Sequence, residues 1–185
     1  MPKRPVIFQP GMYYHLYHRG MGGQAAFREE ADYLAFLRLF KQTADASQVA
    51  VIAYSLLPDH YHCLLRQDGE TPVGQALRRV EDEYAADGVA FESSGRAMRV
   101  ATESDFLTLC RYIHRNPLHH GLVAAPGDWP YSNYLEWIER RRGTLVTCDL
   151  VRAYFPTPQA YQTLAALPEP PGFQEGLRQA GMETP

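Results

Sequence analysis

The sequence has few cysteines, almost no lysine and no long apolar run. Its three cysteines, Cys63, Cys110 and Cys148, are widely spaced and form no CxxC pair, which argues against a disulfide framework and against a zinc knuckle. No stretch approaches the roughly 20 apolar residues of a membrane span. The N-terminus has basic residues but lacks the apolar segment of a secretory signal. We therefore expect a cytoplasmic protein with reduced thiols and no membrane partner.

Positive charge comes almost entirely from arginine. Sixteen of the eighteen basic residues are Arg, and the two exceptions are Lys3 and Lys41. The planar guanidinium suits contacts to phosphates and bases, but a GC-rich genome would produce the same bias. Because the net charge is −3, composition alone does not indicate a strong nonspecific DNA-binding protein.

The chain of 185 residues is long enough for one hydrophobic core and too short for two comfortable domains. Apolar periodicity predicts strands at 12–18, 49–57 and 60–66, a hairpin over 88–101, and helices at 27–46, 71–86 and 104–116. Pro117 is expected to end the last of these helices. This order predicts an α+β fold of the ferredoxin-like or RRM-like kind, an antiparallel sheet with helices on one face.

Composition changes towards the C-terminus. The stretch beyond residue 125 is rich in aromatic residues and prolines, and it leads into the run Arg140-Arg141-Arg142. We expect residues 1–137 to form the main domain and residues 138–185 an extension packed on it. The tail ends in a segment rich in Pro, Glu and Gly, so its last dozen residues are expected to be flexible.

The string PDHYHCLL, residues 58–65, places two histidines at the start of a predicted strand. Side chains two apart in a strand point to the same face, so His60 and His62 project together while Tyr61 packs into the core on the other side. Neutral imidazoles so placed can bind one divalent ion. Two ligands alone make a poor metal site, and a pair of hydrogen-bonded sheet residues would show the same pattern.

A further ligand is available in RYIHRNP, residues 111–117. Tyr112 and Asn116 are four residues apart, so they share one face of the predicted helix and offer a phenol and a carboxamide oxygen. Taken separately, such a tyrosine is usually a packing residue, and an asparagine before proline usually ends a helix. Together with the HxH strand, however, the two residues supply a nucleophile and a third ligand.

Four segments of the sequence resemble the HUH single-tyrosine transposases, in particular their REP-associated tyrosine transposase branch. They are YHLYHRG (14–20), LLPDHYHCLL (56–65), YIHRNPLHHGLV (112–123) and DWPYSNY (128–134), and their order and spacing agree from residue 13 to about 137. The resemblance implies that residues 1–137 form an HUH endonuclease core. It also implies that His60 and His62 bind Mg²⁺ or Mn²⁺ together with Asn116, and that Tyr112 is the nucleophile.

The implied reaction is cleavage and joining of single-stranded, hairpin-associated DNA. A hard cation would polarise the phosphodiester and orient in-line attack. The oxygen of Tyr112 would attack phosphorus, leaving a 5′-phosphotyrosine and a free 3′-hydroxyl, and a second 3′-hydroxyl would reverse the step. A phenol with an ordinary pKa near ~10 must lose its proton as it attacks, and the sequence identifies no general base for it.

Two features depart from the family pattern. Tyr61 stands where an aliphatic residue is usual, and Glu81-Asp82-Glu83 follows Arg78 and Arg79 in a stretch that is usually basic. The excess of acidic over basic residues weakens the expectation of tight DNA binding more than it weakens the expectation of catalysis. Our candidates for contacts to DNA are Arg19, Arg78, Arg79, Arg96, Arg99, Arg111 and Arg115.

Two other classes of protein fit the same residues. One is a nucleic-acid-binding or regulatory protein, catalytically silent or domesticated, which keeps the fold and does not cleave; the acidic balance favours it. The other is an HxH phosphoesterase that acts on small molecules without a covalent intermediate. In the leading hypothesis the protein acts on single-stranded or hairpin DNA as a monomer or a homodimer.

Overall fold

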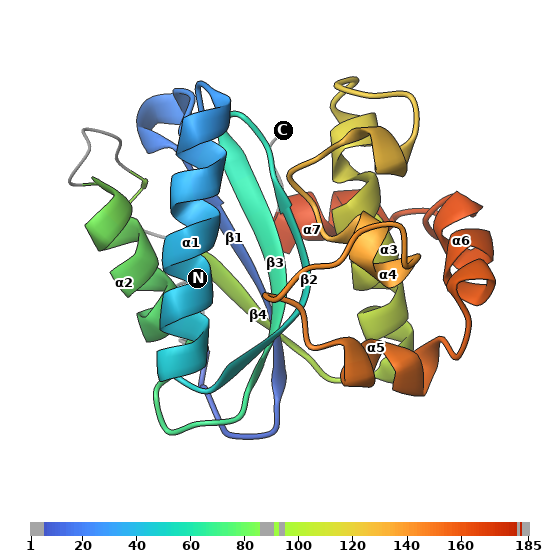
Figure 1. Ribbon diagram of the computed structural model, residues 1–185, viewed down its shortest axis with the longest axis horizontal. Coiled ribbons are helices and arrows are strands. Elements are labelled where there is room, and N and C mark those ends of the chain that lie inside the picture. The colour runs from blue at the N-terminus through green and yellow to red at the C-terminus, as the bar shows by residue number, and fades with distance from the viewer. Residues whose placement is uncertain (1–5, 86–90, 93–94, 181, 183–185) are drawn as a thin grey trace.

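A four-stranded antiparallel sheet lies between two layers of helices (Figure 1). This computed structural model describes residues 6–85, 91–92, 95–180 and 182. Along the chain the elements are β1 (Tyr13–Arg19), the short 3₁₀ helix η1 (Met21–Gly23), α1 (Glu30–Ala46), β2 (Val49–Leu56), β3 (His60–Gln67), α2 (Val73–Ala85), β4 (Arg96–Val100), α3 (Glu103–His119), η2 (Pro126–Asp128), α4 (Tyr134–Trp137), α5 (Cys148–Tyr154), α6 (Pro158–Ala166) and α7 (Phe173–Ala180).

The strands lie in the order β2-β3-β1-β4. β2 and β3 form a hairpin, and β1 sits between β3 and β4, so that the chain's first strand is central. A register shift between Val51 and Ala53 marks a bulge in β2. The α+β class, the antiparallel sheet and the first three strands agree with the sequence-based prediction.

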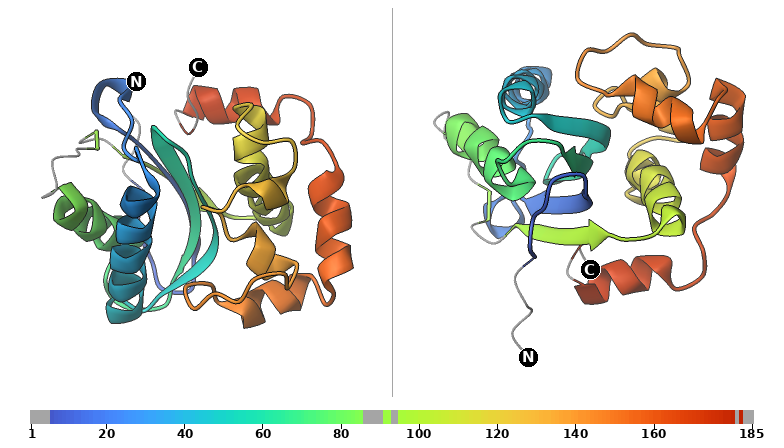
Figure 2. Two further views of the ribbon diagram at one scale, coloured as in Figure 1. Left: turned by 45° about the horizontal axis from the view of Figure 1, so that its top comes forward. Right: turned by 90° about the horizontal axis from the view of Figure 1, so that it is seen from below.

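Helices cover both faces of the sheet, which corrects the prediction of one covered face (Figure 2). On one face, α1 and α2 pack on the sheet through residues such as Phe36 and Leu77, next to Tyr61. On the opposite face, α3 packs through Leu109 and Ile113. β2 is buried at all of its eight positions. A strand covered on both faces reads as a continuous apolar run rather than an alternating one, which explains the composition of VAVIAYSL.

Local capping sets the start of α1. The backbone N–H groups of Arg28 and Glu29 donate to the Asp32 carboxylate at 2.7 and 3.2 Å. Because these bonds satisfy donors that a helix leaves unpaired at its N-terminus, the helix begins at Glu30 rather than at Phe27, the predicted start.

The third helix is longer than predicted. Its start agrees with the sequence, since the Thr102 hydroxyl accepts from the Asp105 N–H at 3.1 Å. It then continues through Pro117 to His119, so the prediction that Pro117 ends the helix is wrong. The proline lies in the last turn, where its missing N–H removes one backbone hydrogen bond, and the turn stays closed by the bond from His120 N to Asn116 O at 3.1 Å.

The hairpin predicted over 88–101 lies partly outside the described residues. Within the described part, β4 pairs with β1, and Phe91 forms an isolated bridge with Gly20. β4 is an edge strand of the sheet.

The C-terminal helices pack around α3. Phe155, Tyr161, Leu177 and Met182 are buried in the same cluster as Ile113. The segment for which we expect flexibility thus includes most of α7, with a buried leucine on it. No helix in the described part of the chain is both long and apolar enough to cross a membrane.

Candidate active site

Four polar side chains meet between β3 and α3. The His60 Nε2 lies 3.2 Å from the Asn116 Oδ1, and the Asn116 Nδ2 donates to the Tyr112 hydroxyl at 3.2 Å. The His62 ring stands perpendicular to the His60 ring, with centroids 5.3 Å apart, and edge-on to the Tyr112 ring at 5.5 Å. All four side chains are completely buried. His60 and His62 share one face of β3 because side chains alternate along a strand. Tyr112 and Asn116 share one face of α3 because they are four residues apart, and these two faces pack against each other.

Neighbouring side chains hold both imidazoles by the Nδ1 atom. The His60 Nδ1 lies 2.7 Å from the Asp59 carboxylate, and the His62 Nδ1 lies 3.0 Å from the His15 Nε2 on β1. Burial lowers the pKa of His15 to about 3 and that of His62 well below its ordinary value. The His62 ring is therefore neutral near pH 7, the form in which imidazole binds metals.

The residues present fit a divalent cation. When His60 donates its Nδ1–H to Asp59, the neutral ring turns the lone pair of Nε2 towards the Asn116 Oδ1, so two acceptors face each other. A cation between them, or a second proton on the ring, resolves this contact. Adjacent ligands at about 2.1 Å from an octahedral ion lie about 3 Å apart, close to the 3.2 Å observed. A carboxylate that orients a ligating histidine, as Asp59 does, is the common outer-shell arrangement.

The candidate ligand set of His60, His62 and Asn116 depends on the oxygen of the asparagine. Among the described residues, no three His, Cys, Asp or Glu side chains gather in a way that could hold a metal ion. Imidazole nitrogen with carboxamide oxygen is a mixed ligand set, and Mn²⁺ accepts nitrogen ligands more readily than Mg²⁺ does.

Tyr112 is enclosed by rings from two directions. Besides His62 on the sheet, His119 of the same helix and Phe173 of α7 lie with ring centroids 5.5 and 5.6 Å from the Tyr112 ring. The hydroxyl accepts from the Asn116 amide, while Phe173 of the C-terminal segment packs against the ring. This contact between α7 and the candidate nucleophile was not visible in the sequence.

Known proteins resemble this chain in sequence and in fold. No protein-family model matches the chain. A curated protein of Haemophilus influenzae described as a REP-associated tyrosine transposase is 26% identical, over 56% of this chain and 69% of that protein. A solved structure of a REP-associated tyrosine transposase bound to a REP hairpin superposes with a TM-score of 0.68 at 16% identity, covering 79% of this chain and 94% of that one. The chain is thus similar in sequence and in fold to REP-associated tyrosine transposases.

The candidate DNA-contacting arginines divide between the two faces of the sheet. Tyr17 pairs with both His62 and Arg96 across the strands, and its ring lies 4.9 Å from the His62 ring, so Arg96 is on the histidine face. Arg19 pairs with His60 and lies 3.5 Å from the Asp59 carboxylate. Arg96 is exposed, and Arg19 is half-buried. These two arginines flank the histidine pair.

The other candidate arginines lie elsewhere. Arg78 and Arg79 are on α2, in the layer opposite the histidines, and Arg99 projects from β4 towards that layer beside Tyr14. Arg111 is buried in α3. Arg115 contacts the Glu169 carboxylate at 3.1 Å and the Ala165 carbonyl at 3.0 Å, so it ties α3 to the C-terminal segment.

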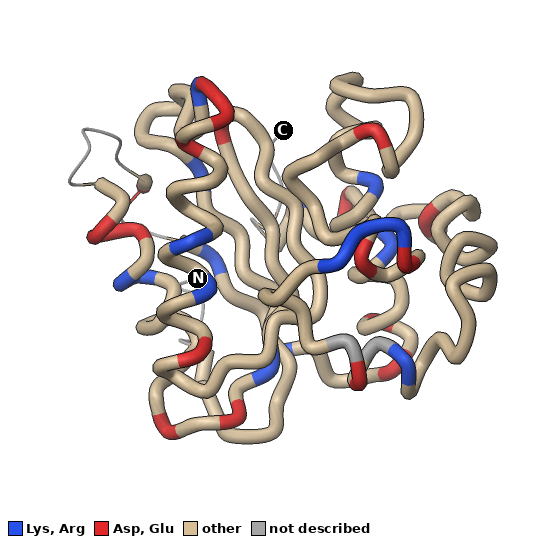
Figure 3. The backbone as a smooth tube through the Cα atoms, in the orientation of Figure 1, with Lys and Arg blue, Asp and Glu red and all other residues tan. Residues whose placement is uncertain are grey.

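Charge on the surface is mixed. Figure 3 shows Lys and Arg interspersed with Asp and Glu over both layers, with one basic run that follows α4, Arg140 to Arg142. The middle member, Arg141, donates to the Glu136 carboxylate and to the Pro130 carbonyl at 2.7 and 2.6 Å, so it fastens the loop that precedes α4. Arg141 of this basic run therefore has a structural role.

The remaining histidines have distinct surroundings. His18 points to the α2 layer and pairs with Glu81, whereas His120, at the end of α3, lies with its ring 4.8 Å from the His60 ring. Two partners of the histidine pair could have been proposed from the sequence. Asp59 directly precedes His60, and His15 shares a strand face with Tyr17.

Tyr61, the tyrosine between the two histidines, packs into the core as predicted. It is 1% exposed on the α2 side of the sheet, and its hydroxyl donates to the Glu81 carboxylate at 2.6 Å. We expect Tyr61→Phe to leave DNA cleavage within about threefold of the wild type. The loss of a buried hydrogen bond to a carboxylate should cost about 1–3 kcal/mol in the free energy of unfolding. Urea denaturation and a cleavage assay measure the two effects, and loss of cleavage in folded Tyr61→Phe protein would refute this assignment.

Proposed function

We propose that this protein is a metal-dependent, transposase-type enzyme that nicks and rejoins single-stranded DNA next to a hairpin, through a covalent bond to Tyr112. The observation that carries the proposal is the continuous contact from the Asp59 carboxylate through His60 and Asn116 to the Tyr112 hydroxyl. Through these contacts the Tyr112 hydroxyl lies one side chain away from His60, which supports the proposal. In this proposal the protein acts as a monomer or a homodimer.

Each side chain has a role in the proposed reaction. His60, His62 and Asn116 would hold Mg²⁺ or Mn²⁺, and the bound cation supplies Lewis-acid polarisation of the scissile phosphodiester. The Asn116 amide donates to the Tyr112 oxygen, which fixes its direction and stabilises negative charge that develops there as the proton leaves. The Tyr112 oxygen forms a bond to phosphorus while the bond to the 3′-oxygen breaks, and the departing oxygen takes up a proton.

Complete burial of Tyr112 bears on this mechanism. Because Tyr112 is completely buried, among side chains that include Phe173, DNA can reach the hydroxyl only when neighbouring side chains move. The same burial favours a second candidate function, a hairpin-binding protein that does not cleave.

A labelled-substrate experiment separates the two. The protein is incubated with hairpin-bearing single-stranded oligonucleotides, labelled at either the 5′ or the 3′ end, and Mn²⁺ or Mg²⁺. In a denaturing protein gel, the 3′ label should move with the protein and the 5′ label should appear in a free, shortened oligonucleotide. A gel shift with no adduct in either metal would support the binding protein.

Arg96 should contribute to DNA binding through its place beside the histidines. Removing one phosphate contact is expected to weaken binding across sequences and to lower the salt slope of log K by about 1. We therefore expect Arg96→Ala to weaken oligonucleotide binding and to flatten its salt dependence. Arg79→Ala is the matched control, since Arg79 is also exposed but lies in the opposite layer. Fluorescence anisotropy at several salt concentrations measures both, and equal slopes for Arg96→Ala and the wild type would contradict the prediction.

A further inference from the structure

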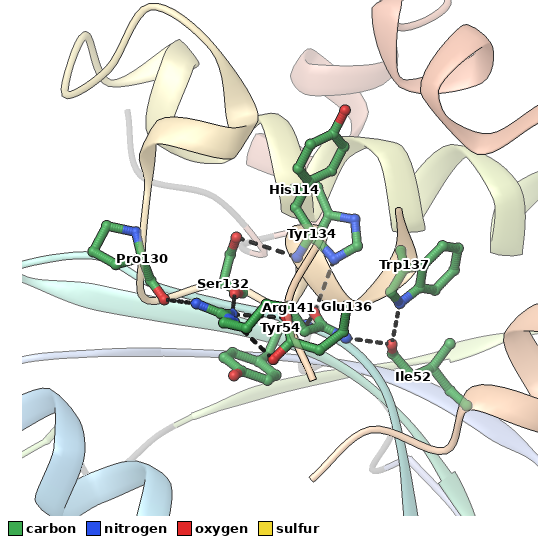
Figure 4. Close-up of polar contacts among 10 residues, drawn as sticks. Ile52, Tyr54, His114, Pro130, Ser132, Tyr134, Glu136, Trp137 and Arg141 are labelled. Carbon is green, nitrogen blue, oxygen red and sulfur yellow. Dashed lines mark hydrogen bonds and ion pairs between the residues drawn. The ribbon is translucent and has the colours of Figure 1, made fainter. Parts of the chain in front are cut away.

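Asn133 bonds to the edge strand at its bulge. Its Nδ2 donates to the Ile52 carbonyl at 2.7 Å, and its Oδ1 accepts from the Tyr54 N–H at 2.7 Å. The Trp137 indole also donates to the Ile52 carbonyl, at 2.9 Å (Figure 4). The Asn133 side chain thus takes the place of a neighbouring strand at the position where the bulge in β2 interrupts regular pairing.

The same oxygen receives a bond from α3. The His114 Nε2 lies 2.8 Å from the Asn133 Oδ1, and its Nδ1 bonds to the Tyr161 hydroxyl. Because the Asn133 Oδ1 can only accept, His114 carries its hydrogen on Nε2. The single hydrogen of the Tyr161 hydroxyl then lies between two acceptors, the His114 Nδ1 and the Cys110 carbonyl, the latter at 3.2 Å. His114, Asn133 and Tyr161 are all completely buried.

These bonds connect the two halves of the candidate site. α3 carries Tyr112 and Asn116, and β2 forms a hairpin with β3, which carries His60 and His62. His114 lies between Tyr112 and Asn116 in the sequence, and a separation of two residues puts it on the opposite side of the helix. Its ring contacts Trp137 of α4 and Tyr161 of α6, with centroids 5.3 and 5.5 Å away. The bond to Asn133 therefore fixes both the rotation and the axial position of α3 relative to the sheet.

We infer that His114 and Asn133 are positioning residues that set the register of α3 against the sheet, and so hold Tyr112 and Asn116 at the two histidines. This inference rests on the proposed function of the site. Apolar packing alone tolerates small shifts of a helix, whereas a fully bonded buried polar network specifies one arrangement. A misplacement of about 1 Å can reduce the rate of a reaction about 10²-fold.

The central test replaces His114 with Phe, which keeps a buried ring and removes both hydrogen bonds. We expect the rate of covalent adduct formation to fall about 10- to 100-fold and the Mn²⁺ concentration for half-maximal rate to rise. His114→Gln, which retains a donor towards Asn133, should recover most of the rate. A purely structural role for His114 would lower the melting temperature and leave the Mn²⁺ dependence of the folded protein unchanged.

Tyr84→Phe is the control. The Tyr84 hydroxyl donates to the Ala26 carbonyl at 2.8 Å, is equally buried and lies in the layer of α1 and α2, away from α3. This variant loses a buried hydrogen bond of similar kind, and we expect its adduct rate and Mn²⁺ dependence to equal those of the wild type.

Hydrogen exchange separates failure of this inference from failure of the proposed function. Amides of residues 109–116 should exchange faster in His114→Phe than in the wild type or in Tyr84→Phe, whether or not the protein cleaves DNA. A wild type that forms no adduct would refute the proposed function and leave the exchange result to decide the positioning role. Unchanged exchange in α3 of His114→Phe, or an unchanged adduct rate and Mn²⁺ dependence in an active protein, would overturn the inference.

Discussion

Tyr112→Phe is expected to abolish the covalent protein–DNA adduct. The change removes one oxygen, the proposed nucleophile, and retains the ring that packs against His62 and Phe173. Because no other atom of the ring can attack phosphorus, we expect adduct formation to fall by at least about 10⁴-fold, below detection. The measurement is a denaturing protein gel with the 3′-labelled hairpin oligonucleotide and Mn²⁺.

Binding and stability serve as controls for this variant. The affinity for the hairpin should stay within a few-fold of the wild type, because Tyr112 is buried and offers no surface to the free DNA. Tyr61→Phe is the matched substitution, since it removes a hydroxyl one residue away from both histidines but on the opposite face of the sheet. An adduct that persists in Tyr112→Phe would refute the assignment of Tyr112 as the nucleophile.

His60→Ala should remove metal dependence and activity together. The change deletes the nitrogen that faces the Asn116 oxygen at 3.2 Å and leaves at most two of the three candidate ligands. We expect Mn²⁺ affinity to fall at least about 100-fold and adduct formation to fall below detection. Electron paramagnetic resonance of free Mn²⁺ measures the first quantity without reference to DNA cleavage.

Asp59→Asn provides a graded comparison. It keeps His60 and weakens the 2.7 Å contact that orients the ring, and loss of such an outer partner typically costs 10- to 100-fold in metal affinity or activity. Mn²⁺ affinity should therefore rank wild type, Asp59→Asn, His60→Ala. If His60→Ala binds Mn²⁺ as tightly as the wild type, the metal lies elsewhere.

Short-range periodicity accounts for what the sequence predicted well. Alternation along β3 put His60 and His62 on one face and Tyr61 on the other, and a spacing of four put Tyr112 and Asn116 on one face of α3. Each inference depends only on backbone geometry over a few residues, and the structure has the same orientations. The boundaries of α1 and α3 were less accurate, because capping at Asp32 and burial around Pro117 decided them.

Local periodicity did not predict that helices cover both faces of the sheet. The prediction had helices on one face only, because the choice of α3 as the second cover depends on contacts more than fifty residues apart along the chain, such as the 3.2 Å contact between His60 and Asn116. The division of the arginines between the two faces also depends on how distant segments pack. Arg96 lies beside the histidines because β4 pairs with β1, while Arg79 lies in the other layer.

By itself the sequence determined the chemical groups of the candidate site, the resemblance to REP-associated tyrosine transposases, and the faces on which single elements present these groups. Only the tertiary structure decided how two faces meet, that His15 and Asp59 hold the imidazoles, that Phe173 covers Tyr112, and that Asn133 ties His114 to the edge strand. The physical reason is that periodicity is a property of a backbone over a few residues. A contact between distant segments depends instead on the packing of the whole chain, in which buried polar groups must find partners.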